Sequence, residues 1–540
     1  MSNEFSRPTK TVKDTFESAR RGHIGDMFTV IQWYDTNRYN YEVNEKTKKE
    51  FLTKIKDEIE NNNPYFSEIK LKNYKGILSA KIKLDPKLNI FVGDNGYGKT
   101  TIIDAIIKSS TWITNGIKNS SNGEGIEQDE INNSVDVYES SINATLNIGI
   151  SDFNIILNKA KQGMPATNSS VLSEYKLLSK IYTDLNKEPL FGLPLFESFS
   201  ISRSLDIEKE HCKKQNINIQ RVNKTDIYNN NDNKKKFKHL IEWLAYQQKK
   251  DNINNQVESS NISLLRKTLE LNSQIYDQIP EEIKKTDIGK ELSIKIRNLK
   301  EEIDKEEIDN TTLTNIKILT KLLKEFMNIS NIHIQATDDQ IRVLLDKDGV
   351  TIDAYQLSQG EKAVFSLLTG IAYQLLILNP QKGEKALNGK GVVIIDEIDL
   401  HLHPKWQQEI VLKLTKAFKN IQFILTTHSP QVLTTIDSHC IKKIKNTNGI
   451  IKINEPEFSL GSESKMVLEE IFNVSSRPEN IETVKELNEL QKLISEDKWD
   501  TDRAKELIEK LNEWAGRNDP VIKKLEMDIK LRKRRMDMKK

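Results

Sequence analysis

The stretch "NIFVGDNGYGKTTIIDAI", residues 89 to 106, decides the fold of this chain. It begins with apolar residues, continues through a glycine-rich loop and ends with the apolar spacing of a helix. The loop matches G-x-x-x-x-G-K-[ST] in the strand-to-helix context that this pattern requires. Backbone N–H groups of such a loop can approach phosphate oxygens closely, because glycine has no side chain to obstruct them. The stretch therefore predicts a site for ATP.

The residues of this loop have distinct expected roles. Lys99 would reach the β and γ phosphates, and the Thr100 hydroxyl would ligate Mg²⁺. The positions that we expect to contact ATP in and after the loop are Asn95, Gly96, Gly98, Lys99, Thr100 and Thr101.

A second apolar strand, "GVVIIDEIDL", ends in Asp396 and Glu397. A buried parallel strand that runs into two acids is typical of a sheet edge that holds a metal ion. We expect Asp396 to fix Mg²⁺ through water and Glu397 to polarise the attacking water. If "DE" stood alone, two solvated acids would be the better interpretation, but the phosphate loop favours the catalytic one.

Composition limits the class of protein. The chain has 540 residues, of which 30% are charged and 37% hydrophobic, and no apolar run approaches 18 residues. We expect a soluble, cytoplasmic protein of two or three domains without a membrane span or signal peptide. The two cysteines, Cys212 and Cys440, offer neither a disulfide framework nor a cysteine metal site. A net charge of +2 leaves room only for local basic patches.

The apolar periodicity changes several times along the chain, and these changes predict five segments. Helix-period positions precede the first strands, and a charged, Asn/Lys-rich region with short amphipathic helices interrupts the α/β pattern. The predicted segments are a helical N-terminal extension (1–62, read as a hairpin), a first ATPase half (63–200), a helical insertion (201–328), a second ATPase half (329–455) and a helical, partner-binding C-terminal region (456–540).

Two further motifs complete a recognisable set. "LSQGEKAVFSLLTGIA" begins at residue 357, and "FILTTHSP" begins at residue 423. In order, the phosphate loop, "LSQGEK", "VVIIDE" and "TTHSP" resemble the motifs of an ABC-type ATPase of the SMC, Rad50, RecF and OLD branch. The resemblance covers roughly residues 66 to 110 and 340 to 440. It implies an α/β fold, an ABC-type P-loop ATPase head with helical additions.

The resemblance also implies that two heads sandwich two nucleotides. Ser358, Gln359, Gly360 and Glu361 would then cap ATP held by the other head, at the start of the helix that follows. Gln359 stands where transporters carry glycine, as is ordinary in the SMC-like branch. His428 would contact the γ-phosphate in cis, and Asp399 would lie in the loop that crosses to the partner. Gln128 is the candidate for the family's Q-loop, although the neighbouring polar loop offers other residues.

The segment "GSESKMVLEEIFNVSSRPENIETVKELNELQKLI", residues 461 to 494, resembles the C-terminal region of PtuA-type ATPases of Septu anti-phage systems. That resemblance implies an ATPase that restrains an HNH nuclease subunit, PtuB. In the retron-associated form, it also implies a reverse transcriptase and its DNA–RNA product, and the extra N-terminal helices favour this form. A DNA-repair ATPase of the Rad50 or RecF kind, acting on DNA ends or gaps, is the alternative.

Three other motifs have weaker interpretations. In "WDTDRAKEL", Asp500 and Asp502 are better explained as a helix cap than as part of a Toprim nuclease. In "HLHP", a helix entry at Pro404 explains the sequence better than a zinc site does. The basic clusters are either solvated charge runs or nucleic-acid contacts. They comprise Lys234, Lys235, Lys236 and Lys238 in the insertion and Arg532, Lys533, Arg534 and Arg535 in the tail.

Overall fold

The computed structural model places most of the chain in two compact units, Met1–Gly461 and Ser462–Lys540, and each is described here by itself. The described residues are 11–36, 45–118, 122–134, 136–165, 167–188, 190–200, 223–229, 238–248, 260–284, 286–310, 312–336, 341–514 and 518–537.

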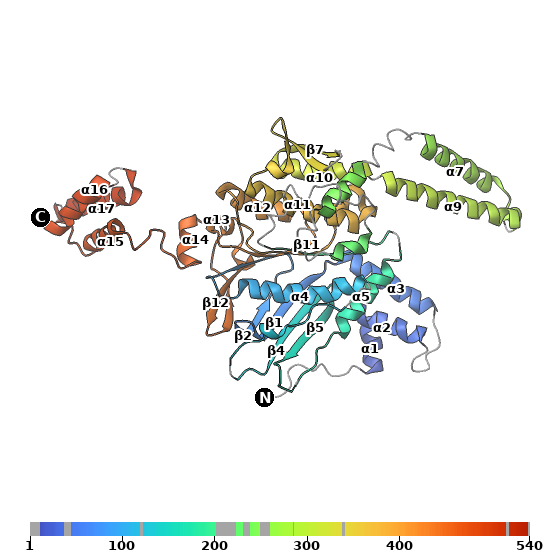
Figure 1. Cartoon of the computed structure of the whole chain (residues 1–540), viewed down its shortest axis with the longest axis horizontal. Helices are drawn as coiled ribbons and strands as arrows, with labels where there is room; N and C mark the ends of the chain where they lie inside the picture. The colour runs from blue at the N-terminus through green and yellow to red at the C-terminus, as the bar shows by residue number, and fades with distance from the viewer. Residues whose placement is uncertain are drawn as a thin grey trace. The chain divides into compact units, whose positions relative to one another are not determined.

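A ten-stranded mixed sheet, in the order β5-β4-β1-β2-β13-β12-β3-β11-β10-β6, forms the centre of the first unit (Figure 1). Its strands are β1 (Tyr65–Tyr74), β2 (Ile77–Lys83), β3 (Leu88–Val92), β4 (Glu139–Ile148), β5 (Ser151–Ala160), β6 (Leu195–Phe199), β10 (Gly391–Ile395), β11 (Ile421–Thr426), β12 (Ile441–Thr447) and β13 (Ile450–Asn454).

The strands β3, β11, β10 and β6 are parallel neighbours. Every residue of β3, β10 and β11 is buried, as expected for strands covered on both faces. Their carboxyl ends therefore meet at one edge of the sheet, where the sequence predicted the ATP site.

The strands β1, β2, β4 and β5 form antiparallel pairs at the other end of the sheet. Burial alternates along β4, so this part of the sheet buries one face, and α4 (Lys99–Ile117) and α5 (Ser173–Leu185) pack near it.

The N-terminal extension contains three described helices, where the sequence predicted a hairpin. They are α1 (Val12–Arg20), α2 (Ile24–Asp35) and α3 (Glu45–Asn61). Gly22, with φ of 96°, makes the turn that separates α1 from α2. Lys390, just before β10, donates hydrogen bonds to the carbonyl oxygens of Ile59 and Asn62, each at 3.0 Å. The end of α3 is thereby attached to the ATPase core.

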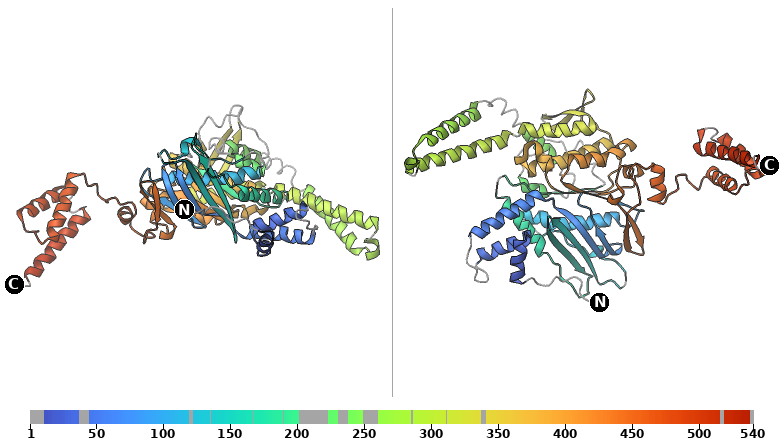
Figure 2. Two further views of the ribbon diagram at one scale, coloured as in Figure 1. Left: turned by 90° about the horizontal axis from the view of Figure 1, so that it is seen from below. Right: turned by 180° about the vertical axis from the view of Figure 1, so that it is seen from behind.

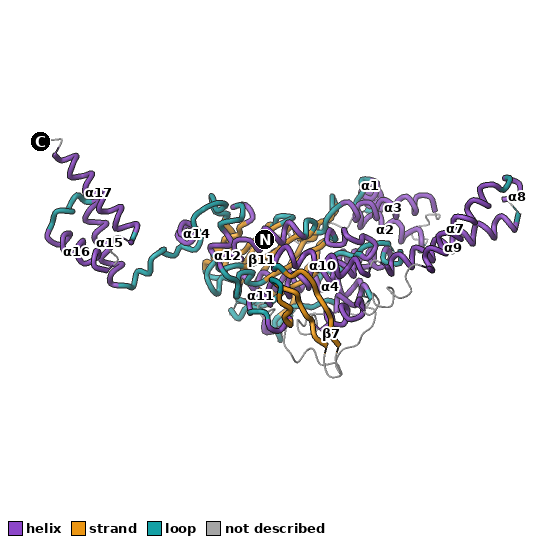
Figure 3. The backbone as a smooth tube through the Cα atoms, turned by 90° about the horizontal axis from the view of Figure 1, so that it is seen from above, coloured by secondary structure: helices purple, strands orange, loops and turns teal. Residues whose placement is uncertain are grey.

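The predicted insertion divides into a hairpin and two helices that belong to the core. Its first part, 201–222, lies outside the described residues. A 3₁₀ helix (Lys224–Asn229) and a helix over 238–248 follow, and the Trp243 ring lies 5.3 Å from that of Tyr373. The hairpin is formed by α7 (Ser260–Gln278), α8 (Glu281–Lys284) and α9 (Asp287–Asn310), as Figure 3 shows. α10 (Thr312–Met327) packs on the second half of the core.

A second, three-stranded sheet and a long buried helix follow the insertion in the chain. The strands β7 (Ile329–Ala336), β8 (Ile341–Lys347) and β9 (Val350–Asp353) form this antiparallel sheet. The 3₁₀ helix Ala354–Gln356 leads into α11 (Gln359–Leu378), which is long and apolar enough to cross a membrane, yet 78% of its most apolar window is buried inside the protein. The 3₁₀ segment Pro380–Asn388, α12 (Pro404–Ala417), α13 (Pro430–Leu433) and the 3₁₀ turn Ser438–Cys440 complete the core.

The described residues after β13 form helices and no strand, as the sequence predicted. These helices are α14 (Ser464–Glu470), α15 (Glu482–Ser495), α16 (Asp502–Trp514) and α17 (Pro520–Asp537). Figure 2 shows the helices near the C-terminus in red. α15, α16 and α17 share a small apolar core that includes Leu490, Trp499, Leu507 and Ile522.

Candidate ATP site

The phosphate loop joins the buried strand β3 to the first turn of α4. Gly96 and Gly98 have φ of 81° and 95°, a left-handed conformation that glycine adopts at little cost. A Cβ atom on Gly98 would also lie 3.1 Å from Cδ1 of Ile77, so the side chain of the first residue of β2 packs closely on the loop. Asn95 lies exposed in this loop, and Thr101 is the third residue of α4. The loop thus presents backbone groups at a helix N-terminus, as phosphate binding requires.

The Lys99 side chain folds back over the loop. Its Nζ donates to the carbonyl oxygens of Gly93 at 2.7 Å and Asp94 at 3.1 Å, and only 8% of the residue is exposed. Burial lowers the pKa of Lys99, and the carboxylates of Asp396 and Glu397 oppose this shift. The ammonium group therefore lies beside acids at the loop, where phosphate oxygens would replace the carbonyls as partners.

Thr100 and Asp396 come together from positions far apart in the sequence. The Thr100 hydroxyl lies 3.3 Å from Oδ2 of Asp396, which follows β10 and is 7% exposed. A hydroxyl and a carboxylate are hard oxygen ligands, the kind that Mg²⁺ prefers in phosphate sites. These two residues fit the metal predicted from the sequence and would hold it between protein and phosphates.

Thr426, at the end of β11, holds both acids of the β10 edge. Its hydroxyl donates to Oδ1 of Asp396 at 2.5 Å and accepts from the Glu397 N–H at 2.7 Å. Glu397 has a left-handed backbone with φ of 50°, an unfavourable conformation for a residue with a Cβ. Because Thr426 is fully buried and bonded to both residues, it fixes the direction in which Glu397 leaves the sheet. Sequence reasoning missed this role, although two threonines preceding His428 were visible in "TTHSP".

Asp399 links the loop after β10 to the predicted histidine switch. Its Oδ1 accepts from the Thr427 hydroxyl at 2.5 Å and from the His428 N–H at 3.3 Å. A movement of the loop containing Asp399 would therefore be transmitted to His428 through the same carboxylate.

The predicted signature segment caps α11. Ser358 is the N-cap residue, and its side chain and backbone exchange hydrogen bonds with Glu361. Burial alone would raise the pKa of Glu361, but the ion pair with Lys347 at 2.8 Å and the Ser358 groups hold it below its usual value. Gln359, the first residue of α11, is exposed together with Ser358.

Gly360 places this segment against the loop that follows the catalytic acids. A Cβ atom at Gly360 would lie 2.4 Å from the carbonyl oxygen of His401, which is backbone and cannot turn aside. Glycine is therefore required by packing within this chain. The signature segment and the Asp399 loop form one surface.

Gln128 lies in the 3₁₀ turn Gln128–Glu130, and both ends of its side-chain amide are bonded. Nε2 donates to the Ala160 carbonyl at 3.1 Å, and Oε1 accepts from the Gln162 N–H at 3.0 Å. Gln128 would have to leave both partners to reach a metal ion.

The end of β6 is hydrogen-bonded to the predicted metal ligand, because the Asp396 N–H donates to the Phe199 carbonyl at 3.0 Å. Ser200, the last described residue there, was not among the predicted site residues.

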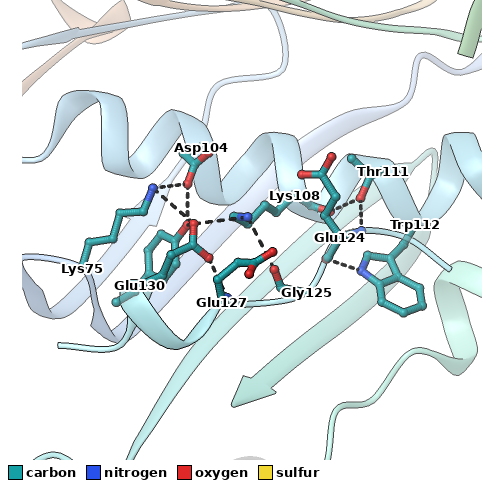
Figure 4. Close-up of polar contacts among 10 residues, drawn as sticks. Lys75, Asp104, Lys108, Thr111, Trp112, Glu124, Gly125, Glu127 and Glu130 are labelled. Atoms are coloured by element: carbon teal, nitrogen blue, oxygen red, sulfur yellow. Dashed lines mark hydrogen bonds and ion pairs between the residues drawn. The ribbon is translucent and has the colours of Figure 1, made fainter. Parts of the chain in front are cut away.

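A buried polar network supports the phosphate-loop helix on another face (Figure 4). Lys75 lies 2.6 Å from Asp104 of α4, and Lys108 of α4 lies 3.2 Å from Glu130. The Lys108 and Glu130 side chains are only 9% and 12% exposed. Burial and the neighbouring acids Asp104 and Glu130 raise the pKa of Tyr74, so its hydroxyl remains a donor to this network. The network fixes α4 to the β1–β2 turn and to the turn that carries Gln128.

The weaker motifs lie in helix starts. α12 begins at Pro404, and the His403 ring accepts a hydrogen bond from the Lys405 N–H at 3.3 Å. α16 begins at Asp502, Thr501 accepts from the Ala504 N–H, and Asp500 pairs with Lys505. Among the described residues, no group of three or more His, Cys, Asp and Glu side chains is arranged to hold a metal ion.

The basic clusters differ in how far they can be described. Lys234, Lys235 and Lys236 lie outside the described residues, and Lys238 lies 3.8 Å from Glu242. In the tail, Arg532 pairs with Asp497 and Asp528, and Lys533 lies over the Trp499 ring. Arg534 and Arg535 are exposed.

A protein-family model described as "AAA domain, putative AbiEii toxin, Type IV TA system" matches residues 88–434. The chain is 31% identical over 539 residues to "Retron Ec83 probable ATPase" of Escherichia coli, covering 98% of this chain and 97% of that protein. It is also 31% identical to "Retron Vc95 probable ATPase" of Vibrio cholerae serotype O1 biovar El Tor over 84% of this chain and 87% of that one. Septu protein PtuA of Bacillus mycoides is 37% identical over 99 residues, 16% of this chain and 13% of PtuA.

Among solved structures, the Smc head domain of Pyrococcus furiosus is similar over 72% of this chain and 96% of that one, with 15% identity and a TM-score of 0.42. The α/β class and the ABC-type ATPase head predicted from the sequence are confirmed by the sheet order and by the matching AAA domain.

Proposed function

This chain belongs to the family of the retron Ec83 and Vc95 ATPases, and on that premise we propose that it is the ATP-hydrolysing switch of an anti-phage defence complex. In this complex, two heads close over two nucleotides, and a partner HNH nuclease of the PtuB type cleaves nucleic acid. The complex acts in the cytoplasm.

The proposal that two heads close on each other rests on the position of the signature segment. Ser358 and Gln359 are exposed at the start of α11, and their neighbour Gly360 packs on His401, beyond the catalytic acids. The backbone N–H and the hydroxyl of Ser358 both donate to the Glu361 carboxylate, and not to the phosphate loop of the same chain. A second copy that offers the same surface would supply the missing cap on each nucleotide.

The chain's own residues account for hydrolysis. Lys99 and the loop N–H groups bind and orient the phosphates. When Mg²⁺ is bound by Thr100 and Asp396, it adds charge stabilisation at the transferred phosphoryl group. Glu397 accepts a proton from the attacking water, and His428 donates a hydrogen bond toward the γ-phosphate. Thr426 positions Glu397, and Asp399 positions His428, each by accepting a hydrogen bond from the backbone N–H.

The retron-linked form is supported by the extent of the similarity. Two retron ATPases match most of the chain, whereas two PtuA proteins match 16% and 23% of it. We therefore propose that a reverse transcriptase and its DNA–RNA product are further components of the complex. The helices after Gly461 belong to a separate compact unit, so they are the proposed contact for the nuclease.

Co-expression with the HNH partner tests this proposal. The full chain should co-purify with the partner and restrain it, and a chain that ends at Gly461 should hydrolyse ATP but lose the partner. Purified alone, the full chain should leave DNA and RNA uncut. Robust metal-dependent cleavage by the single chain, abolished by changing Asp500 and Asp502, would overturn the proposal, and stimulation by DNA ends without any partner would favour the repair alternative.

A further inference from the structure

The outward face of α17 carries cations that form no ion pair with any acid among the described residues. Residues 520–540 contain nine Lys and Arg against three Asp and Glu, whereas residues 462–519 contain nine against fifteen. The C-terminal unit therefore separates its charge, and the positive part is concentrated in one helix and its end.

Helical spacing arranges the exposed cations of α17 in two rows. Lys523, Lys530 and Arg534 follow one another at i, i+7 and i+11, and the same spacing repeats one residue later. The second row consists of Lys524, Leu531 and Arg535. Met527 lies between the rows and is 64% exposed. Ile522, Leu525 and Ile529 face the apolar core instead.

Several acids of the unit form ion pairs with other cations. Arg503 pairs with Glu489 and Glu506, Arg477 with Asp519, and Lys510 with Glu486. Of the three acids within α17, Asp528 pairs with Arg532 and Glu526 accepts from Asn512, whereas the side chain of Asp537 lies outside the described residues. Within the described residues, no such ion pair is formed by the five outward cations, which are Lys523, Lys524, Lys530, Arg534 and Arg535. They span about 18 Å at 1.5 Å per residue.

We propose that this face of α17 binds the phosphate backbone of a nucleic acid. Unpaired Lys and Arg in rows bind phosphates without reading bases, and release of counterions supplies the affinity. The exposed Met527, between the rows, and Leu531, within the second row, would contact sugars. An acidic surface of a second copy is the less favoured occupant, because Glu486, Glu489 and Glu506 of α15 and α16 already have internal partners. The inference does not depend on ATP binding.

Salt-dependent binding by the full chain tests the proposal, with labelled single-stranded RNA, single-stranded DNA and duplex DNA as probes. Five phosphate contacts predict a slope of log Kd against log salt of about 4.5 on duplex and about 3.5 on a single strand. Replacing all five cations by glutamine should remove most of that slope and leave basal ATP hydrolysis unchanged.

A matched pair of double variants gives the control. Lys523→Gln with Lys530→Gln should lower the duplex slope by about 1.8, since each phosphate contributes about 0.9. Lys485→Gln with Lys492→Gln, at the same spacing on α15 and likewise exposed, should leave the slope unchanged. Equal effects of the two pairs, salt-insensitive binding, or loss of self-association in place of nucleic-acid binding would overturn the proposal.

Discussion

The Thr426 hydroxyl lies 2.5 Å from Oδ1 of Asp396 and donates to it, although thirty residues separate the two in the chain. The parallel pairing of β10 with β11 brings them together. The same hydroxyl accepts from the Glu397 N–H, so one side chain positions both the metal ligand and the catalytic base.

Thr426→Val should therefore lower kcat for ATP hydrolysis by about 10-fold, because a buried hydrogen bond is lost while the side-chain shape is retained. KM should change little, since Lys99 and the loop still bind the phosphates. Steady-state kinetics measure kcat and KM separately. Thr426→Ser, which keeps the hydroxyl, should retain most of the wild-type rate. A wild-type rate in Thr426→Val would contradict the role given to the hydroxyl.

Lys99→Ala should weaken ATP binding about 100-fold, because it removes the charge that pairs with the β and γ phosphates. The fold should persist, which circular dichroism checks. Near wild-type affinity, measured by calorimetry on the folded variant, would contradict the assignment of the phosphate loop.

Glu130→Gln should destabilise the protein by about 3 kcal/mol, because it leaves the buried Lys108 ammonium without its carboxylate. Lys108→Met should have a similar effect. The double variant should lose less than the sum of the two single losses, since it leaves neither charge unpaired. Urea denaturation measures all three, and additive losses would show that Lys108 and Glu130 do not interact.

The parts of the site that lie close together in the sequence could be predicted from it. The loop before α4 and the acids after β10 carry their chemistry within a few residues, so spacing and strand context were sufficient. Thr426 could not be found in this way, because its role depends on which strand lies beside β10. The tight fit of Gly360 on His401 likewise depends on tertiary packing.

Segment boundaries were less predictable for the same reason. The helix over 238–248 has an amphipathic pattern that suits an independent insertion, yet Trp243 packs on Tyr373 of α11. α10 similarly contacts β7 and α11, so among the described residues of the predicted insertion the α7–α9 hairpin is the part outside the core. The sequence placed the C-terminal region from residue 456, and the compact unit begins at Ser462.

Glu397→Gln should bind ATP but hydrolyse it about 100-fold or more slowly, because an amide cannot accept the proton of the attacking water. ATP should then remain bound long enough for closed heads to accumulate. Hydrolysis at the wild-type rate would refute the role of Glu397 as base.

The mass of the Glu397→Gln variant in solution, with Mg²⁺ and either ATP or ADP, tests ATP-dependent closure of two heads most directly. We predict that the mass with ATP, but not with ADP, shows two chains or assemblies joined through their heads. Adding Ser358→Arg should abolish this association without loss of nucleotide binding, because the large side chain obstructs the exposed start of α11. A mass that is the same with ATP, with ADP and in the Ser358→Arg variant, while ATP is shown to be bound, would contradict head-to-head closure.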